Sequence, residues 1–439
     1  MSYQEAVDHL DSLGVDAMKK LAPSTHRIEA LCDLLNNPER HVPAIHITGT
    51  NGKTSTARFA TSMLAAAGLS VGTYTSPHLQ SVRERITLGN EPLPESVFGD
   101  VFEHVKPYVE VVESNLAERI SYFEILTAMF FLWAAETVDA VVVEVGMGGR
   151  WDATNVLPSS VPVVTNVGLD HTAMLGPDRV TIAKEKVGIV KPGATVVTAE
   201  RAPDVLAILE EGGPAARIGR EFDVIDNRVA LGGRYLSLRS GSRSYEGLFL
   251  PIHGAHQGVN AATALEAVAR FVPARELDQE IVADGLAGAR VPGRLETLRL
   301  EGLDAPVLLD VAHNPDGMSA AITSIIEAFA FERVVFVLGV LRDKDYDGML
   351  AEIARVESLV ITTEARNARS VPGHELARSA ASRGIASEVV KGVDQAIGRA
   401  REIAGSKGLI CITGSHYVVG EARDVLLPSE AQLTQTGER

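Results

Sequence analysis

A glycine-rich turn between an apolar strand and a helix constrains the fold of this chain more than any other feature. Residues 44–47 have the apolar pattern of a buried strand, and a helical pattern follows the turn and ends near Gly68. Glycines in such a turn let successive backbone N–H groups surround phosphate oxygens, and the helix adds the positive end of its dipole. The pattern therefore predicts a phosphate-binding loop. The turn reads Thr48-Gly49-Thr50-Asn51-Gly52-Lys53-Thr54-Ser55.

Individual side chains of this loop have predicted roles. Lys53 is expected to bridge the outer phosphates of ATP, and the hydroxyl of Thr54 to bind Mg²⁺. The match to the general P-loop pattern is imperfect, because Ile47 stands where that pattern has its first glycine. A turn that merely begins a helix therefore remains the alternative. The residues predicted to contact ATP are Gly49, Thr50, Asn51, Gly52, Lys53, Thr54 and Ser55.

The rest of the chain alternates short apolar strands with helical patterns, which is typical of an α/β protein with a mainly parallel sheet. From about Phe222 to Leu250, short strands separated by glycines predict appended antiparallel hairpins. Val291-Pro292-Gly293 interrupts the helical pattern and predicts a hinge. We therefore expect a P-loop-containing, mainly parallel sheet domain with appended hairpins over residues 1–290, and a smaller α/β domain over residues 291–439. Helices are expected near residues 123–135, 260–271 and 319–330, strands at 140–143, 161–165, 307–309, 334–338, 358–362 and 409–413, and a frayed end over the last dozen residues.

Composition narrows the class of protein. The 439 residues carry 57 acidic and 41 basic side chains, a net charge of −16 that disfavours a general nucleic-acid binder. We find neither a secretory signal nor a run of about 20 apolar residues that would span a membrane. Cys32 and Cys411 are too few for a disulfide framework. One bridge between them is conceivable, but two separate thiols suit the reducing cytoplasm, where we expect the protein to reside.

Two polar residues follow predicted strands. Glu144 comes directly after Val141-Val142-Val143, and ligands of α/β proteins bind where parallel strands end, so Glu144 is a candidate Mg²⁺ ligand. An exposed glutamate at a strand end is the alternative. His171 follows the strand at residues 161–165. A lone histidine is more often structural, and Mg²⁺ prefers oxygen ligands.

Several short motifs occur together in one order. They are residues 48–55, Thr75-Ser76-Pro77-His78-Leu79, Val82-Arg83-Glu84-Arg85-Ile86, Tyr122-Phe123-Glu124-Ile125-Leu126-Thr127, Arg150-Trp151-Asp152-Ala153-Thr154-Asn155, Lys184-Glu185-Lys186 and Asp310-Val311-Ala312-His313-Asn314-Pro315. This series resembles the Mur ligase superfamily, and more narrowly the folylpolyglutamate synthase/dihydrofolate synthase family. The resemblance extends over nearly the whole chain. Trp151 departs from it, because relatives often have leucine there.

The resemblance implies a metal and a pterin site. Mg²⁺ would be held by Ser76, Glu144 and His171, which favours the ligand interpretation of His171. Lys186 matches a lysine that is carbamylated in the family, and its new carboxylate can hold the metal. Core packing remains the alternative for Phe123. The residues implied on the pteridine side are Ser121, Tyr122, Phe123, Glu124, Trp151, Asp152 and Ala153.

The resemblance also assigns residues near the nucleotide and the incoming amino acid. Asn260, Arg294 and Asp310 match positions that contact ATP, and a surface salt bridge is the alternative for Arg294. His313 and Ser415 match second-domain positions near the reacting centre, as does Asn314. The implied catalytic set is Lys53, Lys186 and His313.

The implied reaction joins L-glutamate to the carboxylate of a pteroate or folate through an acyl phosphate, with ATP and Mg²⁺, and we favour a bifunctional enzyme. A monovalent cation is a further candidate cofactor, and a monomer without macromolecular partners is expected. A cell-wall Mur ligase is one alternative, disfavoured because fewer than 50 residues precede the loop, below the usual domain size of about 50. A P-loop nucleotide switch is the other, disfavoured because we find no Asn-Lys-x-Asp motif.

Overall fold

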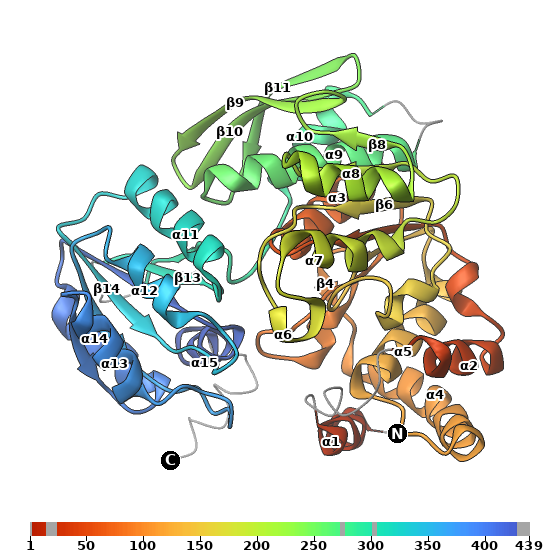
Figure 1. Ribbon diagram of the computed structural model, residues 1–439, viewed down its shortest axis with the longest axis horizontal. Coiled ribbons are helices and arrows are strands. Elements are labelled where there is room, and N and C mark those ends of the chain that lie inside the picture. The colour runs from red at the N-terminus through yellow and green to blue at the C-terminus, as the bar shows by residue number, and fades with distance from the viewer. Residues whose placement is uncertain (1, 15–23, 273–276, 301–304, 428–439) are drawn as a thin grey trace.

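The computed structural model describes residues 2–14, 24–272, 277–300 and 305–427. It has two α/β bodies and a small antiparallel sheet that lies over both (Figure 1). The predicted fold class is therefore confirmed. The predicted frayed end lies outside the described residues. No helix within the described ranges is long and apolar enough to cross a membrane.

The first sheet has eight strands in the order β4-β3-β2-β5-β1-β6-β7-β8. Strands β2, β5, β1, β6, β7 and β8 run parallel, whereas β3 and β4 pair antiparallel at the edge. Every residue of β1, β5 and β6 is buried, as near-continuous apolar runs predict for strands covered on both faces. The bounds are β1 Ala44–Thr48, β2 Val71–Tyr74, β3 Ile86–Leu88, β4 Glu91–Pro92, β5 Ala140–Glu144, β6 Val161–Val164, β7 Val196–Thr198 and β8 Ala215–Arg217.

Alternate strand residues face two different apolar cores, because side chains point to opposite faces with a period of two. Ile45, Ile47 and Val142 pack against α3, α9 and α10, whereas Val141 and Val143 pack against α1, α2, α4 and α5. A third core lies under α7 and α8. The bounds are α1 Tyr3–Leu13, α2 His26–Leu34, α3 Lys53–Ala66, α4 Glu95–Leu116, α5 Tyr122–Thr137, α6 Thr172–Leu175, α7 Arg179–Lys186, α8 Pro203–Gly212, α9 Ala255–Phe271 and α10 Gln279–Ala287.

The predicted hairpins are present as an antiparallel sheet of β9 (Phe222–Ala230), β10 (Gly233–Ser240) and β11 (Arg243–Leu250). Gly232 and Gly241 have positive φ at the two tight turns, which glycine adopts readily. This sheet contributes Leu236, Leu238 and Leu248 to the core around α9. Its role as a support for α9 was not predicted.

The second α/β body has a six-stranded sheet in the order β12-β13-β17-β14-β15-β16, parallel except for β12. Helices α11, α12 and α13 cover one face, and α14 and α15 cover the other. All four predicted strands of this half are confirmed. The bounds are β12 Glu296–Leu298, β13 Val307–Asp310, α11 Pro315–Ala328, β14 Arg333–Leu338, α12 Tyr346–Ile353, β15 Ser358–Thr362, α13 Gly373–Ser382, β16 Ala386–Val389, α14 Val393–Ala404, β17 Gly408–Thr413 and α15 His416–Leu426.

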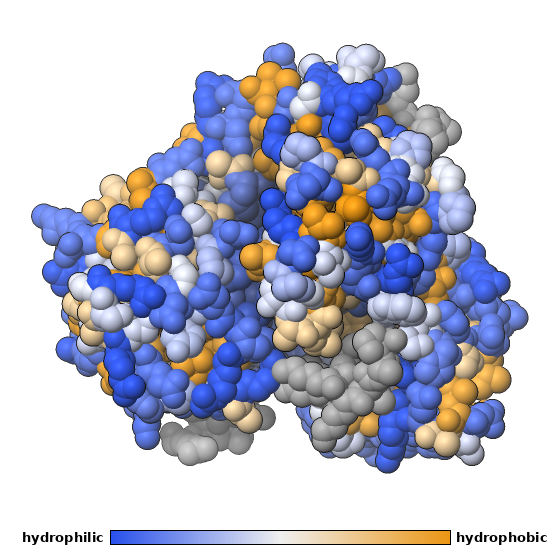
Figure 2. Space-filling model, in the orientation of Figure 1, coloured by the Kyte–Doolittle hydropathy of each residue, from blue (hydrophilic) through white to orange (hydrophobic). Residues whose placement is uncertain are grey.

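The two bodies touch at a polar recess, which the space-filling view shows between them (Figure 2). Arg234 of β10, 1% exposed, donates to Glu327 of α11 at 2.8 and 3.1 Å. The connection passes through Gly293, whose φ of 69° lies in the left-handed region. We propose a domain boundary at residues 290/291, because the apolar cores around β13 and β17 are built from residues beyond it. Leu79 of the first domain packs against one of these cores. Both cysteines are buried and unbridged.

Candidate active site

The phosphate-binding loop lies where β1 ends and α3 begins, as predicted. Gly52 is the residue before the helix and has a φ of 81°, a conformation that side chains disfavour. At Gly49, a Cβ atom would lie 1.8 Å from the hydroxyl of Thr165, so only glycine fits. The ammonium of Lys53 folds back over the loop and donates to the carbonyls of Gly49 and Thr50 at 3.1 and 3.2 Å. Burial lowers the pKa of Lys53, and the charge of Glu144 opposes that shift.

A second loop, residues 165–168, holds the first one in place. The amide of Asn51 donates to Asn166 Oδ1 at 3.0 Å, and the amide of Thr50 donates to the Asn166 carbonyl at 3.0 Å. Thr165 donates its hydroxyl to the Asn51 carbonyl at 2.7 Å. The N–H groups of the first turn of α3, which a helix leaves without internal partners, are of the kind that suits phosphate. Sequence reasoning singled out this segment only for His171 and missed the role of Asn166.

Glu144 lies beside the loop because β5 pairs with β1, with Glu144 opposite Ile47. Its carboxylate is 1% exposed and accepts from the Thr54 hydroxyl at 3.0 and 3.1 Å and from the Ser76 amide at 3.2 Å. Burial raises the pKa of Glu144, while Lys53 and these two donors lower it. The buried carboxylate and the Thr54 hydroxyl together offer the oxygen donors that Mg²⁺ prefers.

His171 is not joined to the other two predicted metal ligands. Its Nε2 lies 3.9 Å from Asp170 Oδ2, and within the described residues its side chain forms no hydrogen bond with Ser76 or Glu144. Burial lowers the pKa of His171 to about 4, so the ring is neutral near pH 7. Among the described residues, no three His, Cys, Asp or Glu side chains cluster as a metal site.

Asp170 joins the first domain to the second. Lys344 Nζ lies 2.6 Å from Asp170 Oδ1, His313 Nε2 lies 3.4 Å from Oδ2, and Asn314 donates to Oδ2 at 3.4 Å. Asn314 also donates to the side chain of Asn51 in the phosphate loop at 3.1 Å. Burial alone would raise the pKa of Asp170, but the hydrogen bond from His313 and the charges of His171 and Lys344 hold it well below its ordinary value.

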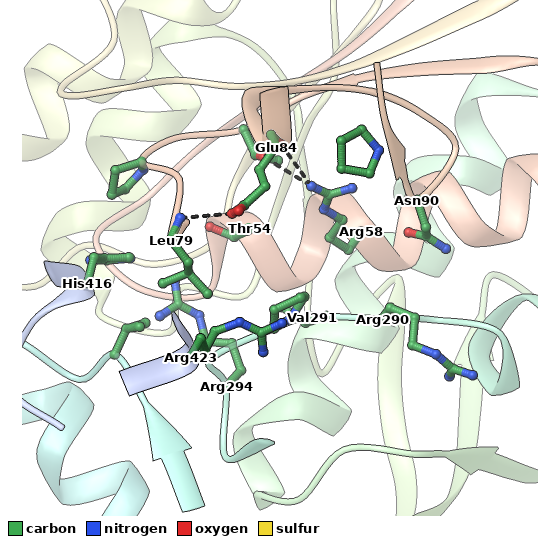
Figure 3. Close-up of a pocket in the computed structure, with 15 residues that line it drawn as sticks. Thr54, Arg58, Leu79, Glu84, Asn90, Arg290, Val291, Arg294, His416 and Arg423 are labelled. Carbon is green, nitrogen blue, oxygen red and sulfur yellow. Dashed lines mark hydrogen bonds between the residues drawn. The ribbon is translucent and has the colours of Figure 1, made fainter. Parts of the chain in front are cut away.

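The three nucleotide contacts predicted outside the phosphate loop lie around this recess. Asn260 packs on the phosphate loop so closely that a Cβ at Gly52 would meet its Oδ1 at 2.4 Å. Arg294 lines a cavity of about 250 Å³ with Thr54 and Arg58 at its wall (Figure 3). Asp310 accepts the amides of Leu295 and Ala312, both at 2.9 Å, and thus fixes the chain beside the hinge.

Lys186 is the last residue of α7 and lies against the phosphate loop. It is 3% exposed, and its ammonium donates to the Gly49 carbonyl at 2.9 Å. Burial, and then the charge of Lys53, lower the pKa of Lys186 to about 7. A lysine with this pKa is largely neutral in mildly alkaline solution. It can therefore react as an amine.

The predicted pteridine residues on α5 divide into two groups. Ser121 and Glu124 form the capping box of α5, each side chain bonding the other's amide, and Glu124 also pairs with Arg27 at 3.0 Å. Both side chains therefore hold the start of the helix. Tyr122 lies under the guanidinium of Arg85, 5.3 Å from the ring centre. Phe123 packs near Tyr74, at 5.7 Å between ring centres, and reaches Gly146 beside Glu144.

The remaining predicted substrate residues lie in short turns. Asp152 accepts the Met147 amide at 3.0 Å, and its other oxygen accepts the amide and hydroxyl of Thr154. Trp151 is 50% exposed beside it, whereas Ala153 is buried. Ser415 caps α15 by accepting the Val418 amide at 3.2 Å. These positions shape the site, and direct substrate contact stays a prediction for each.

Comparison with known proteins identifies the class. The family model of the Mur ligase middle domain matches residues 47–268. The family model of the Mur ligase, glutamate ligase domain matches residues 293–416. A dihydrofolate synthase/folylpolyglutamate synthase of Mycobacterium tuberculosis is 40% identical over 387 residues, covering 83% of this chain and 79% of that protein. Its counterpart in Bacillus subtilis is 33% identical over 419 residues, covering 91% and 94%.

Solved structures agree with these matches. A Mycobacterium tuberculosis folylpolyglutamate synthase complexed with ADP superposes with a TM-score of 0.91 at 36% identity, covering 97% of this chain and 98% of that one. Escherichia coli FolC in complex with DHPP and ADP superposes with a TM-score of 0.85 at 28% identity, covering 97% of each chain. The fold and the site thus define a ligase of the Mur type. Within that class, the chain belongs to the folylpolyglutamate synthase/dihydrofolate synthase family.

Proposed function

We propose that the protein uses ATP to add L-glutamate to the carboxylate of a folate-type substrate. One observation carries the proposal. The phosphate loop and Glu144 belong to the first domain, and His313, Asn314 and Lys344 of the second domain meet them through Asp170 and Asn51. A phosphate donor and an amino acid held by the glutamate ligase domain would therefore share one recess. The activities named for the relatives agree with this arrangement.

The chemistry explains why both domains are needed. A carboxylate does not accept an amine near pH 7, because oxide is a poor leaving group. Transfer of the terminal phosphoryl group of ATP makes an acyl phosphate, and Lys53 and the start of α3 neutralise the charge that develops on that group. The glutamate amine then attacks the acyl carbon, and phosphate leaves from the tetrahedral intermediate. The proton that the amine loses would pass to the departing phosphate, while His313, held between the Val311 carbonyl and Asp170, would position the second domain at this centre.

Mg²⁺ fits the oxygen-rich end of the site. Thr54 and Glu144 would hold it, with Ser76 at its edge and His171 as a further candidate. When bound, the ion would neutralise phosphate charge. Such a cation would also favour the ionised form of Glu144, which burial alone disfavours.

Glu144→Gln should reduce the Mg²⁺-dependent rate by about 10²-fold or more, roughly 3 kcal/mol of transition-state stabilisation. The glutamine keeps the shape and an acceptor oxygen, so the thermal midpoint should stay within about 2 °C of the parent value or rise, since a buried charge is removed. Phosphate release titrated with Mg²⁺, alongside calorimetry, measures both. Glu332→Gln at an exposed ion pair is the matched control. An unchanged Mg²⁺ requirement in Glu144→Gln would refute the ligand role.

We further propose that Lys186 is carbamylated. Carbon dioxide would add to its neutral amine with loss of a proton, turning a cation into a carboxylate. Burial and the low pKa supply the neutral amine, and the adjacent Lys53 favours an anion there. The modification would place a second carboxylate near the phosphate loop.

The finer assignment of substrates rests on the walls of the site. We propose that the pterin lies against Tyr122, Phe123 and Asp152, with Trp151 at the rim, and that dihydropteroate and tetrahydrofolate both serve as acceptors. The E. coli neighbour is described in complex with DHPP. We further propose a cytoplasmic monomer, which the two unbridged cysteines suit. A requirement for a monovalent cation belongs to the same proposal.

A phosphate-release assay tests the function. The protein is mixed with ATP, Mg²⁺, one acceptor (dihydropteroate, tetrahydrofolate or a UDP-linked peptide) and one amino acid (L-glutamate, D-glutamate or L-aspartate). We expect release only with a pterin acceptor and L-glutamate together. Release with the UDP-linked peptide would show a cell-wall ligase instead, and release that needs neither substrate would show a nucleotide switch.

A further inference from the structure

The loop between β2 and β3 is fixed to the first domain at both ends. At its start, the Ser76 amide donates to Glu144 at 3.2 Å. At its end, the carboxylate of Glu84 accepts three successive amides, those of Leu79, Gln80 and Ser81, at 2.8, 2.9 and 2.8 Å. The loop is therefore a rigid turn that links the proposed metal site to whatever its tip touches.

The tip of this loop is docked on the second domain. Leu79 packs against the apolar core of β13, β17, α14 and α15. Gln80 donates to Asp424 at 2.9 Å and accepts from Arg423 at 3.0 Å, and Arg423 also pairs with Glu296. Figure 3 shows Glu84 bonded to the amide of Leu79, and Leu79 and Arg423 line the same cavity.

Helix α15 approaches the loop at a glycine. A Cβ on Gly420 would lie 2.2 Å from the Leu79 carbonyl oxygen, and the three nearest atoms all belong to Leu79. Gly420 lies inside a right-handed helix, so its backbone does not require glycine, and glycine weakens a helix interior. Close approach to the loop is thus what the glycine permits. Gly398 in α14 is also inside a helix but has nothing within 4 Å of its Cβ position.

We propose that Gly420 and Leu79 are positioning residues, which let the second domain hold the Ser76 loop in its active arrangement. The proposal rests on the proposed function, in which Ser76 and Glu144 lie at the phosphoryl-transfer site. If α15 moves away, Gln80 loses its contacts with Asp424 and Arg423 and Leu79 loses part of its apolar packing, so the second domain holds the loop tip less firmly. Docking of the second domain then sets the geometry of residues that belong to the first.

Gly420→Ala tests this contact, with Gly398→Ala as the matched control. Since the three atoms nearest to the added methyl group all belong to Leu79, the loop and α15 must move apart at this contact. We expect amide hydrogen exchange across residues 76–81 to speed up about tenfold or more without substrates, with α14 unchanged. We also expect kcat for ligation to fall about tenfold or more, with the KM for ATP within about twofold. Gly398→Ala should match the parent protein in every measurement.

Leu79→Ala approaches the contact from the other side, since it removes the apolar side chain without a clash. It should change exchange and kcat in the same direction. Parent-like exchange over residues 76–81 in Gly420→Ala overturns the proposal, as does a rise spread equally over α14, which would mean general destabilisation. Hydrogen exchange separates the two hypotheses. If loop exchange is faster in Gly420→Ala but the parent protein ligates no folate, the positioning contact is supported and the proposed function is refuted. If the parent protein is active and Gly420→Ala exchanges and ligates as the parent does, the positioning contact alone is refuted.

Discussion

Lys53→Ala should abolish ligation and leave the fold intact. The ammonium of Lys53 rests on the Gly49 and Thr50 carbonyls, directly at the loop that would receive the phosphates. Its charge neutralises the phosphoryl group during transfer, so we expect kcat/KM to fall by about 10³-fold or more, roughly 4 kcal/mol. The fold should persist, because burial already disfavours this cation and, within the described residues, no ion pair joins it to a carboxylate. Phosphate release and circular dichroism measure the two effects.

The control is Lys407→Ala, which removes an exposed lysine paired with Glu332 in the second domain. Lys407→Ala should keep full activity, because its exposed ion pair contributes little to stability and the folded enzyme therefore persists. A Lys53→Ala variant that retains more than about a tenth of the parent kcat/KM, a loss below about 1.4 kcal/mol, would contradict the phosphate-loop assignment. Loss of activity together with unfolding would contradict the prediction that the fold persists.

Local patterns predicted what depends on one element or on two neighbouring strands. Glu144 was recognisable as a site residue because it ends a buried parallel strand, and the structure places it beside Thr54. The hairpins between residues 222 and 250 were recognisable from glycine spacing. The order of the strands was not recognisable from the sequence, because nothing local in β1 indicates that β5 and β6 are its neighbours.

Contacts between distant segments were missed for the same reason. Lys344 and Asp170 are 174 residues apart, and Gln80 and Asp424 are 344 apart. Each looks like an ordinary surface charge or amide in the sequence. Their meeting depends on how two complete domains pack, which no short pattern encodes.

The sequence-based prediction overlooked a local pattern at Ser121 and Glu124. The resemblance assigned both to the substrate, whereas the spacing Ser-x-x-Glu before an apolar run is that of a capping box. The structure has the capping box. Ser415 likewise caps α15. A polar residue at a helix start can serve the helix and the ligand together, so substrate contact at these positions needs its own test.

Lys186→Ala should be inactive and partly rescued by formate or acetate. The variant removes a side chain that is 3% exposed and lies against the phosphate loop, and a small carboxylate can supply the missing anion. We expect a loss of about 10²-fold or more in kcat, or roughly 3 kcal/mol. Rescue should rise with carboxylate concentration and should fail with chloride. Lys184→Ala, two residues earlier and exposed on the same helix, is the matched control and should behave as the parent.

The pH dependence of the parent protein tests the modification itself. Only the neutral amine of Lys186 reacts with carbon dioxide, and its pKa of about 7 makes the neutral form dominant above pH 7 and scarce below it. As pH falls from 8 to 6, carbamylation should decline, and added bicarbonate should restore part of the lost rate. Carbon-13 bicarbonate should give a carbamate resonance in the parent and in Lys184→Ala but not in Lys186→Ala. An unmodified Lys186 in a fully active protein saturated with bicarbonate would show that the free amine does the work.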